Sequence, residues 1–219
     1  MPDVLHFLDV GCGPGRLLLP LAEQGWQVSG LEPDADYFAA AVDCLLQSPQ
    51  IQTIRQGGFE AIHEKKQFHL IAAVNNPFAY LLDNTTRLDA LTRMYDALQP
   101  GGVIFLDFFN LLWHLRHYRQ PEESRISLEN GDTMRRITHY TFDWHDSTLT
   151  HNDIFYRNET YLSTQSHTLS IVAPQTIISL VEQVGFVDMR TYNSYAHIRP
   201  ERIKGGRIMI SAQRPVYSA

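Results

Sequence analysis

The 219-residue chain is 44% hydrophobic, which is enough to bury one full core, and its length fits one α/β domain. Its formal net charge of −6 is spread without a basic block, so the surface that nucleic-acid binding needs is missing. Cys12 and Cys44 lack the spacing of a disulfide framework or metal site, and the longest apolar runs, such as residues 103–109, are too short to span a bilayer. We expect a single domain over residues 1–219 in the cytoplasm, with no nucleic-acid, membrane or metal partner.

The first half of the chain alternates short apolar runs with longer helix-patterned stretches, which is typical of parallel strands joined by crossover helices. Gly25 suits the position after a helix, Asp34 suits a helix N-cap, and Pro20 predicts a bend within the first helix. A Gln-Pro-Gly-Gly turn at 99–102 should end the fourth helix. The predicted strands cover residues 4–10, 27–31, 51–55, 69–74 and 103–108, and the predicted helices cover 16–24, 35–47, 59–64 and 85–98.

The sequence changes in character after residue 109. Residues 110–117 predict a short helix, and residues 133–170, rich in Thr, Tyr, Ile and Phe with a break at 145–147, predict an antiparallel hairpin or small sheet. A last helix over 174–184 and strands over 187–193 and 207–213 should complete the main sheet. We therefore expect residues 110–172 to form an inserted cap.

A glycine-rich run, Asp-Val-Gly-Cys-Gly-Pro-Gly at residues 9–15, follows the first predicted strand and opens a helix. Glycines let a ligand approach the backbone and permit the positive φ angles of a tight turn. Glu32 stands at the end of the second predicted strand, where a carboxylate can bind both ribose hydroxyls of an adenosine. These features predict a nucleoside-containing cofactor. A dinucleotide fingerprint requires a third glycine where Arg16 stands, which disfavours NAD.

The run at 9–15 resembles the first motif of the class I S-adenosylmethionine (SAM)-dependent methyltransferases, and Leu-Glu-Pro-Asp at 31–34 resembles their second motif. Residues 98–102 and the Gly-Phe pair at 185–186 are similar to later motifs. The resemblance implies an α/β, Rossmann-like, doubly wound sheet of seven mostly parallel strands, ordered 3-2-1-4-5-7-6 with the last strand antiparallel. The β insert after strand 5 resembles that of small-molecule methyltransferases acting on glycine or on nucleotide-linked amino sugars.

The resemblance also implies SAM as cofactor and S-adenosylhomocysteine as product. Asp9 would approach the methionine part and Glu32 the ribose, while the third motif, Gln-Gly-Gly-Phe at 56–59, lacks the carboxylate that often meets the adenine amine. Backbone groups at Gly58 and Phe59 would substitute for it, and Asn75 would offer a backbone contact. The implied cofactor-binding residues are Asp9, Gly11, Cys12, Gly13, Gly15, Glu32, Pro33, Gly58, Phe59, Asn75 and Asn76.

The expected reaction transfers a methyl group to a nitrogen or oxygen of a small molecule. A helper base is optional, because the sulfonium carries an excellent leaving group and the protein chiefly aligns the nucleophile and excludes water. The candidate helpers are Tyr80, His114, His139 and His145, with His117 and His151 as further histidines. Trp113, Tyr140, Trp144, Tyr156 and Tyr161 could line a substrate pocket.

Two alternatives stay open: a SAM-binding protein without turnover, and a nicotinamide-dependent oxidoreductase. Asn-Pro-Phe at 76–78 lacks the second proline of the motif found in nucleic-acid and amide methyltransferases, which disfavours that reading. Methyltransferases of this class usually carry an N-terminal helical segment that covers the cofactor, whereas here the first predicted strand begins almost at Met1. We expect that the sequence continues upstream, or that the cover comes from the insert or from another subunit of a homodimer.

Overall fold

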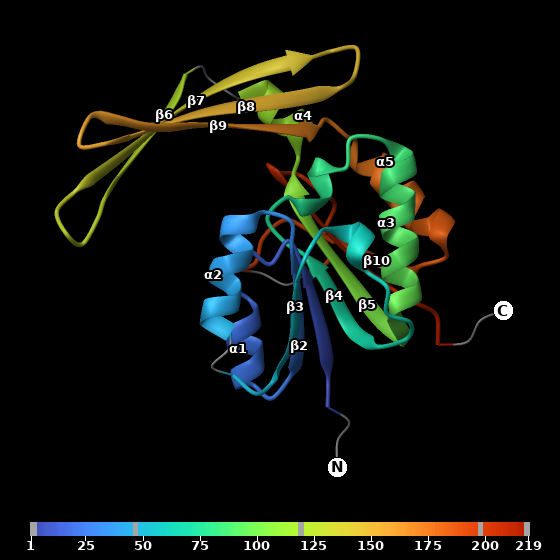
Figure 1. The fold of residues 1–219 in the computed structure, drawn as a ribbon. Coiled ribbons are helices and arrows are strands. Elements are labelled where there is room, and N and C mark those ends of the chain that lie inside the picture. The colour runs from blue at the N-terminus through green and yellow to red at the C-terminus, as the bar shows by residue number, and fades with distance from the viewer. Residues whose placement is uncertain (1–3, 46–47, 118–120, 197–198, 217–219) are drawn as a thin grey trace.

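The computed structural model describes residues 4–45, 48–117, 121–196 and 199–216. Within them, seven strands form the main sheet in the order β10-β11-β5-β4-β1-β2-β3, and β11 runs antiparallel to its neighbours (Figure 1). This order confirms the predicted 3-2-1-4-5-7-6 topology with its antiparallel last strand. The strands are β1 (His6–Val10), β2 (Gln27–Glu32), β3 (Ile51–Gln56), β4 (Phe68–Ala73), β5 (Leu98–Phe109), β10 (Val187–Tyr192) and β11 (Arg207–Gln213).

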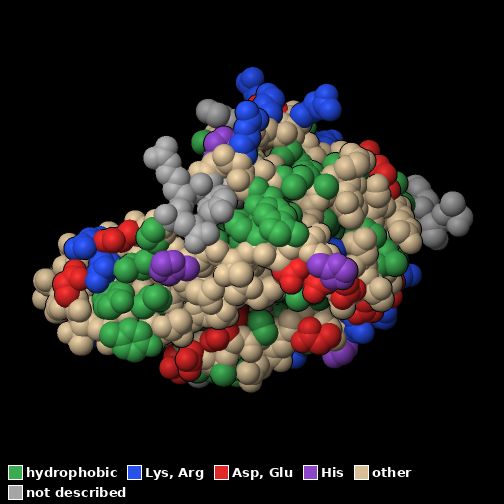
Figure 2. Space-filling view, turned by 90° about the horizontal axis from the view of Figure 1, so that it is seen from above, with side chains coloured by type: hydrophobic (Ala, Val, Ile, Leu, Met, Phe, Trp, Pro, Cys, Tyr) green, Lys and Arg blue, Asp and Glu red, His purple; other side chains and the backbone are tan. Residues whose placement is uncertain are grey.

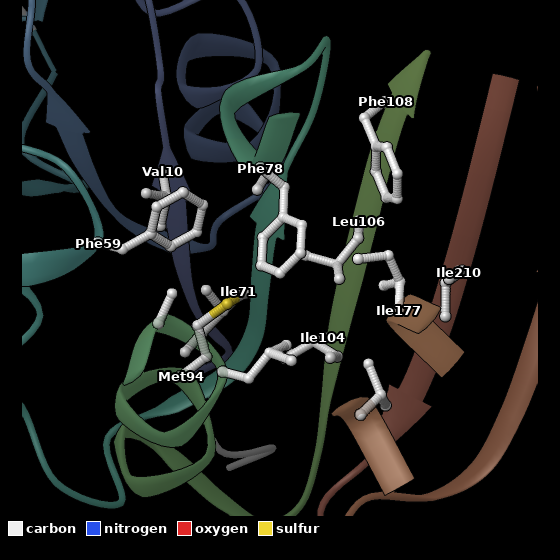
Figure 3. Packing of buried hydrophobic residues seen from close by; sticks show 14 of the residues in the cluster. Val10, Phe59, Ile71, Phe78, Met94, Ile104, Leu106, Phe108, Ile177 and Ile210 are labelled. Carbon is white, nitrogen blue, oxygen red and sulfur yellow. The ribbon is translucent and has the colours of Figure 1, made fainter. Parts of the chain in front are cut away.

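Helices cover both faces of the main sheet, and each face has its own apolar core. Figure 1 shows α1 (Leu18–Glu23) and α2 (Ala35–Leu45) on one side, with α3 (Asn84–Ala97) and α5 (Pro174–Val184) on the other. Figure 3 shows the larger core, where Met94 of α3 and Ile177 of α5 pack toward the sheet residues Ile71 and Ile104. No helix among the described residues has the length and apolar character to cross a membrane.

Two predicted helix features need correction. The first helix begins at Leu18 instead of residue 16, so Pro20 lies in its first turn, where a missing N–H disrupts nothing and no bend is required. The predicted helix over 59–64 is a single 3-10 turn, η1 (Phe59–Ala61), because Ile62 takes an extended conformation and buries its side chain in the core.

Local turn signals match the structure elsewhere. Asp34 caps α2, since its Oδ1 accepts the N–H groups of Asp36 and Tyr37 at 3.0 Å each. Gly25 takes a positive φ of 88° after α1. The Gln-Pro-Gly-Gly segment follows α3 as predicted, but it belongs to β5, where a register shift between Phe68 and Leu70 absorbs it.

The expected insert is a four-stranded antiparallel sheet of β6 (Glu122–Ser127), β7 (Thr133–Asp143), β8 (Thr148–Arg157) and β9 (Thr160–Ser170), preceded by α4 (Leu111–His117). We call it the cap sheet. It lies above the carboxyl ends of the parallel strands and extends to the left (Figure 1). Seen from above, hydrophobic side chains gather near the middle of the molecule's face (Figure 2). Leu149 of β8 and Leu169 of β9 belong to the larger apolar core, so they connect the cap sheet to the main sheet. β6 was not predicted, because all six of its side chains are exposed and give no apolar period.

Candidate cofactor and acceptor site

The loop between β1 and α1 is shaped by its glycines. Gly11 and Gly13 have positive φ angles of 76° and 55°. The N–H of Gly11 donates to the Leu31 carbonyl of β2 at 2.7 Å. A Cβ on Gly11 would lie 2.5 Å from Cγ of Pro77, whereas a Cβ on Gly13 would meet nothing within 4 Å. Gly11 is therefore required by packing, and Gly13 leaves its backbone open to a ligand.

Glu32 at the end of β2 fixes this loop. Its Oε2 accepts the N–H of Gly13 at 2.7 Å, its Oε1 accepts the N–H of Asp34 at 2.9 Å, and the residue is buried. A carboxylate offers about four acceptor positions, so two remain for hydroxyl groups of a ligand. This arrangement fits a ribose diol.

Asp9 at the end of β1 carries an unsatisfied group. The residue is 2% exposed, and its Oδ1 has no hydrogen-bond partner among the residues that the structure describes. Burial raises the pKa of this carboxyl to about 7, against the opposing effect of the Arg16 guanidinium. A buried carboxylate oxygen without a partner, beside the open Gly13, fits a ligand that brings a hydrogen-bond donor such as an ammonium group.

The turn after β4 is strained at two residues. Asn75 and Asn76 have positive φ angles of 69° and 81°. The N–H of Asn75 donates to Oδ2 of Asp107 at 3.2 Å, and Oδ1 of Asn76 accepts the N–H of Phe109 at 2.7 Å. The Asn76 side chain therefore holds β5, while Asn75 faces the space above the glycine loop.

These elements surround a cavity of about 860 Å³, which we call the loop cavity. Of the residues implied for cofactor binding, those that line it are Gly11, Cys12, Gly13, Glu32, Pro33, Gly58, Phe59 and Asn75. Three implied residues are not among those that line the cavity, namely Asp9, Gly15 and Asn76. Gly15 shapes the turn with a positive φ of 90°. Asp9 and Asn76 support the cavity from positions that are almost fully buried.

Sequence reasoning missed some residues of the loop cavity. The third motif appeared to lack a carboxylate, yet Glu60 lines the cavity and its Oε1 accepts the N–H of Gly58 at 2.7 Å. Its position in the motif, one residue past Phe59, was the available signal. His167 of β9 also lines the cavity, and no local pattern marks it, because the cap sheet brings it there from far along the chain.

The structure separates the candidate helper residues. Tyr80 lines the loop cavity, and its hydroxyl lies 3.3 Å from Nδ1 of His167. His139 is exposed on the opposite face of β7 from the buried Thr138, and the His145 side chain is 97% exposed in the β7–β8 turn, so neither of these proposed helpers lines the loop cavity. The side chain of His114 lies outside the described part of the structure.

A second cavity of about 680 Å³, the cap cavity, lies between α4 and the cap sheet. Its lining includes Trp113, His117, Glu122, Glu123, Arg136, Thr138, Tyr140, His151 and Asp153. Of the aromatic residues predicted for a substrate pocket, Trp113 and Tyr140 line it, whereas Trp144, Tyr156 and Tyr161 do not. No three His, Cys, Asp or Glu residues within the described ranges are grouped to hold a metal ion.

Comparison with known proteins agrees with this geometry. A family model described as a methyltransferase domain matches residues 7–102. A ubiquinone biosynthesis O-methyltransferase of Bradyrhizobium sp. (strain ORS 278) is 29% identical over 110 residues, which is 50% of this chain and 42% of that protein. The putative methyltransferase YqeM of Bacillus subtilis (strain 168) is 23% identical over 107 residues, 49% of this chain and 43% of that protein. The match thus spans less than half the length of these curated relatives.

Solved structures are similar over almost the whole chain. A SAM-dependent methyltransferase from Clostridium acetobutylicum ATCC 824 has a TM-score of 0.77 and 13% identity, covering 97% of this chain and 85% of that one. The amino pentose methyltransferase CalS10 from Micromonospora echinaspora, solved with SAM bound, has a TM-score of 0.76 and 20% identity, covering 97% and 84%.

The sheet order, the glycine loop and these likenesses define the fold. The chain has the fold of a class I, Rossmann-like SAM-dependent methyltransferase, with an antiparallel sheet after the fifth strand. Residues 7–102 match the model of a methyltransferase domain.

Proposed function

We propose that this protein binds SAM in the loop cavity and transfers its methyl group to a nitrogen or oxygen of a small molecule. The observation that carries the proposal is the Glu32 carboxylate beside the open backbone of Gly13 in the loop cavity, supported by the buried Oδ1 of Asp9, which has no hydrogen-bond partner among the described residues. A nucleoside with a cationic tail matches these groups, because the ribose diol suits Glu32 and an ammonium suits Asp9.

Each part of the cofactor has a counterpart in the chain. Glu32 would accept the ribose hydroxyls, and Asp9 would accept a hydrogen bond from the ammonium of the methionine part. Gly58, Phe59 and Glu60 would contact the adenine, and the carboxylate of Glu60 would accept a hydrogen bond from its amine. When bound, SAM supplies an activated methyl group on a sulfonium. The chain's own task is to orient the acceptor and to exclude water.

The cap sheet supplies the cover. Tyr80 and His167 close the side of the loop cavity that faces the cap, so an acceptor entering beneath the cap sheet would meet the cofactor there. The proposal also includes a single domain over residues 1–219 with an inserted cap over 110–172. It further includes a cytoplasmic location and a homodimer.

Titration calorimetry tests the cofactor. SAM and S-adenosylhomocysteine should bind at one site per chain, and NAD should not, since Arg16 replaces the glycine that a dinucleotide loop requires. Binding of NAD with equal affinity, or no binding of SAM, would overturn the proposal. Release of S-adenosylhomocysteine over a panel of amines, phenols and acids then separates an enzyme from a protein that only binds the cofactor.

A further inference from the structure

The cap cavity and the loop cavity share a wall made by one row of side chains. Tyr140, His151 and His167 are direct cross-strand partners on β7, β8 and β9. The Tyr140 and His151 rings are 4.8 Å apart, and His167 lies within hydrogen-bond distance of Tyr80. Tyr140 and His151 line the cap cavity, whereas His167 and Tyr80 line the loop cavity. Adjacent members of one cross-strand row, His151 and His167, therefore line the two different cavities.

The cap cavity has the lining of a site for a cation with an apolar body. Trp113, Phe109 and Phe142 supply aromatic surface, and three carboxylates face one guanidinium, that of Arg136. Aromatic faces and carboxylates both favour a cation.

The three carboxylates differ in how far neighbouring groups already neutralise their negative charge. Glu123 pairs with Arg125 at 2.7 Å, and Asp153 accepts from Thr138 at 2.5 Å with Arg136 at 3.9 Å. Glu122 accepts a hydrogen bond from the neutral Tyr140 hydroxyl. Glu122 is therefore the carboxylate with the most charge left for a ligand.

His151 is the basic group of this cavity. Its Nε2 is buried and has no hydrogen-bond partner within the described residues. Burial lowers the pKa of this imidazole, with the neighbouring His167 and Arg136 acting in the same direction against Asp153 and Glu122. The charged or titratable groups that face it are His117 on α4, Glu122 and Glu123 on β6, Arg136 and Tyr140 on β7, Asp153 on β8 and His167 on β9. These effects favour the neutral imidazole, whose Nε2 carries the lone pair that can accept a proton.

We infer that the cap cavity is the acceptor site, that it takes a primary or secondary amine with an apolar body, and that His151 removes the proton that blocks the amine. The inference rests on the proposed function. An ammonium nitrogen has no lone pair, so one proton passes to Nε2 of His151. The nitrogen then forms a bond to the methyl carbon while the carbon–sulfur electron pair leaves with the sulfur. The products are a methylated ammonium and S-adenosylhomocysteine, and His151 returns its proton to solvent.

Binding is tested first, with no need for turnover. The probes are phenethylamine, phenethyl alcohol and phenylpropionate, which share an apolar body and differ in charge. Nuclear magnetic resonance of the indole N–H groups reports the site, because Trp113 lines the cap cavity while Trp26 and Trp144 do not. The amine should shift the Trp113 signal alone and bind about tenfold more tightly than the alcohol or the acid. Equal binding of the three probes, or no shift of Trp113, would overturn the cation site.

Substitutions test whether the carboxylate of Glu122 binds the amine. Glu122→Gln should weaken phenethylamine binding about tenfold, because it removes the carboxylate but keeps an acceptor for Tyr140. Glu129→Gln, an exposed loop residue, is the matched control and should change nothing. Equal loss in both variants, or in neither, would contradict the assignment.

Turnover tests His151. With SAM and phenethylamine, His151→Gln should lower kcat by about 10²-fold and remove the imidazole's contribution to the fall in rate at acid pH, leaving only the fall that comes from protonation of the amine itself. SAM affinity should stay unchanged, and the exposed His63→Gln is the control. A bound amine that is never methylated, or a His151→Gln variant with the wild-type pH profile, would overturn the inference. Failure of SAM to bind would instead refute the proposed function, which calorimetry reports separately.

Discussion

The backbone N–H of Gly13 donates a 2.7 Å hydrogen bond to Oε2 of Glu32, which joins the loop after β1 to the end of β2. This bond orients the carboxylate toward the loop cavity while its remaining acceptor positions stay available. Glu32 is therefore both a support of the loop and the proposed ribose ligand.

Replacing Glu32 by Gln should weaken SAM binding by about 10- to 100-fold, because hydrogen bonds to a charged group contribute about 1.5–3 kcal/mol. Titration calorimetry with SAM and S-adenosylhomocysteine measures the loss. Glu129→Gln provides the control for loss of one negative charge. Unchanged affinity in Glu32→Gln would exclude this carboxylate as the ribose ligand.

The two glycines of the loop should respond differently to alanine. Gly11→Ala places a Cβ 2.5 Å from Pro77 at a positive φ, so it should destabilise the fold by several kcal/mol, about 1–3 from backbone strain and a similar amount from the clash. Gly13→Ala meets no atom within 4 Å and carries the strain alone.

Urea unfolding and SAM titration separate these effects. Gly13→Ala should lose more in SAM affinity than in stability, because its methyl group enters the space left for the ligand. If Gly13→Ala bound SAM normally, the ligand would not approach this part of the backbone.

Asp9 should make the ligand-free protein less stable as pH rises. Its pKa is about 7 in the folded state against 3.8 when exposed, so between these values the unfolded chain releases a proton that the folded chain retains. The stabilisation is complete below about pH 4, is lost by about pH 7, and amounts to on the order of 4 kcal/mol.

Asp9→Asn is neutral at every pH and should lack this component. Urea unfolding of both proteins between about pH 4 and about pH 8 should show the variant gaining stability relative to the wild type as pH rises. Parallel pH profiles would show that the carboxyl is ionised in the folded protein throughout.

Asp107 should be a strong determinant of stability beside the site. Its carboxylate, 1% exposed, binds Nε of Arg207 at 2.6 Å and Nη2 at 2.5 Å, and it also accepts from Tyr195 and from the N–H of Asn75. Asp107→Asn should cost about 3 kcal/mol, because it leaves the guanidinium without its counter-charge.

The control is Asp89→Asn, which removes an exposed ion pair with Arg93 and should cost less than about 1 kcal/mol. Chemical unfolding measures both values, and SAM titration of Asp107→Asn reports whether the Asn75 turn depends on this carboxylate. Similar small losses in the two variants would contradict the role of Asp107.

Much of the fold follows from local patterns. The glycine run, Asp34 as N-cap and Gly25 after α1 each use a turn chemistry that neighbouring residues specify, and all three match. β6 escaped prediction because its side chains are exposed, and the helix over 59–64 failed because burial of Ile62 outweighs helix propensity.

The sequence by itself determined the class of fold and the glycine loop with Glu32, because these depend on residues close together in the chain. Only the tertiary structure decided which histidines reach a cavity, since strand register brings the candidate His151 beside His167, which the sequence did not mark, while His139 and His145 are exposed elsewhere. It also joined Asp107 to Arg207, two residues on adjacent strands whose pairing no local pattern encodes. Contacts of this kind arise from the packing of distant segments, and that packing is a property of the whole chain.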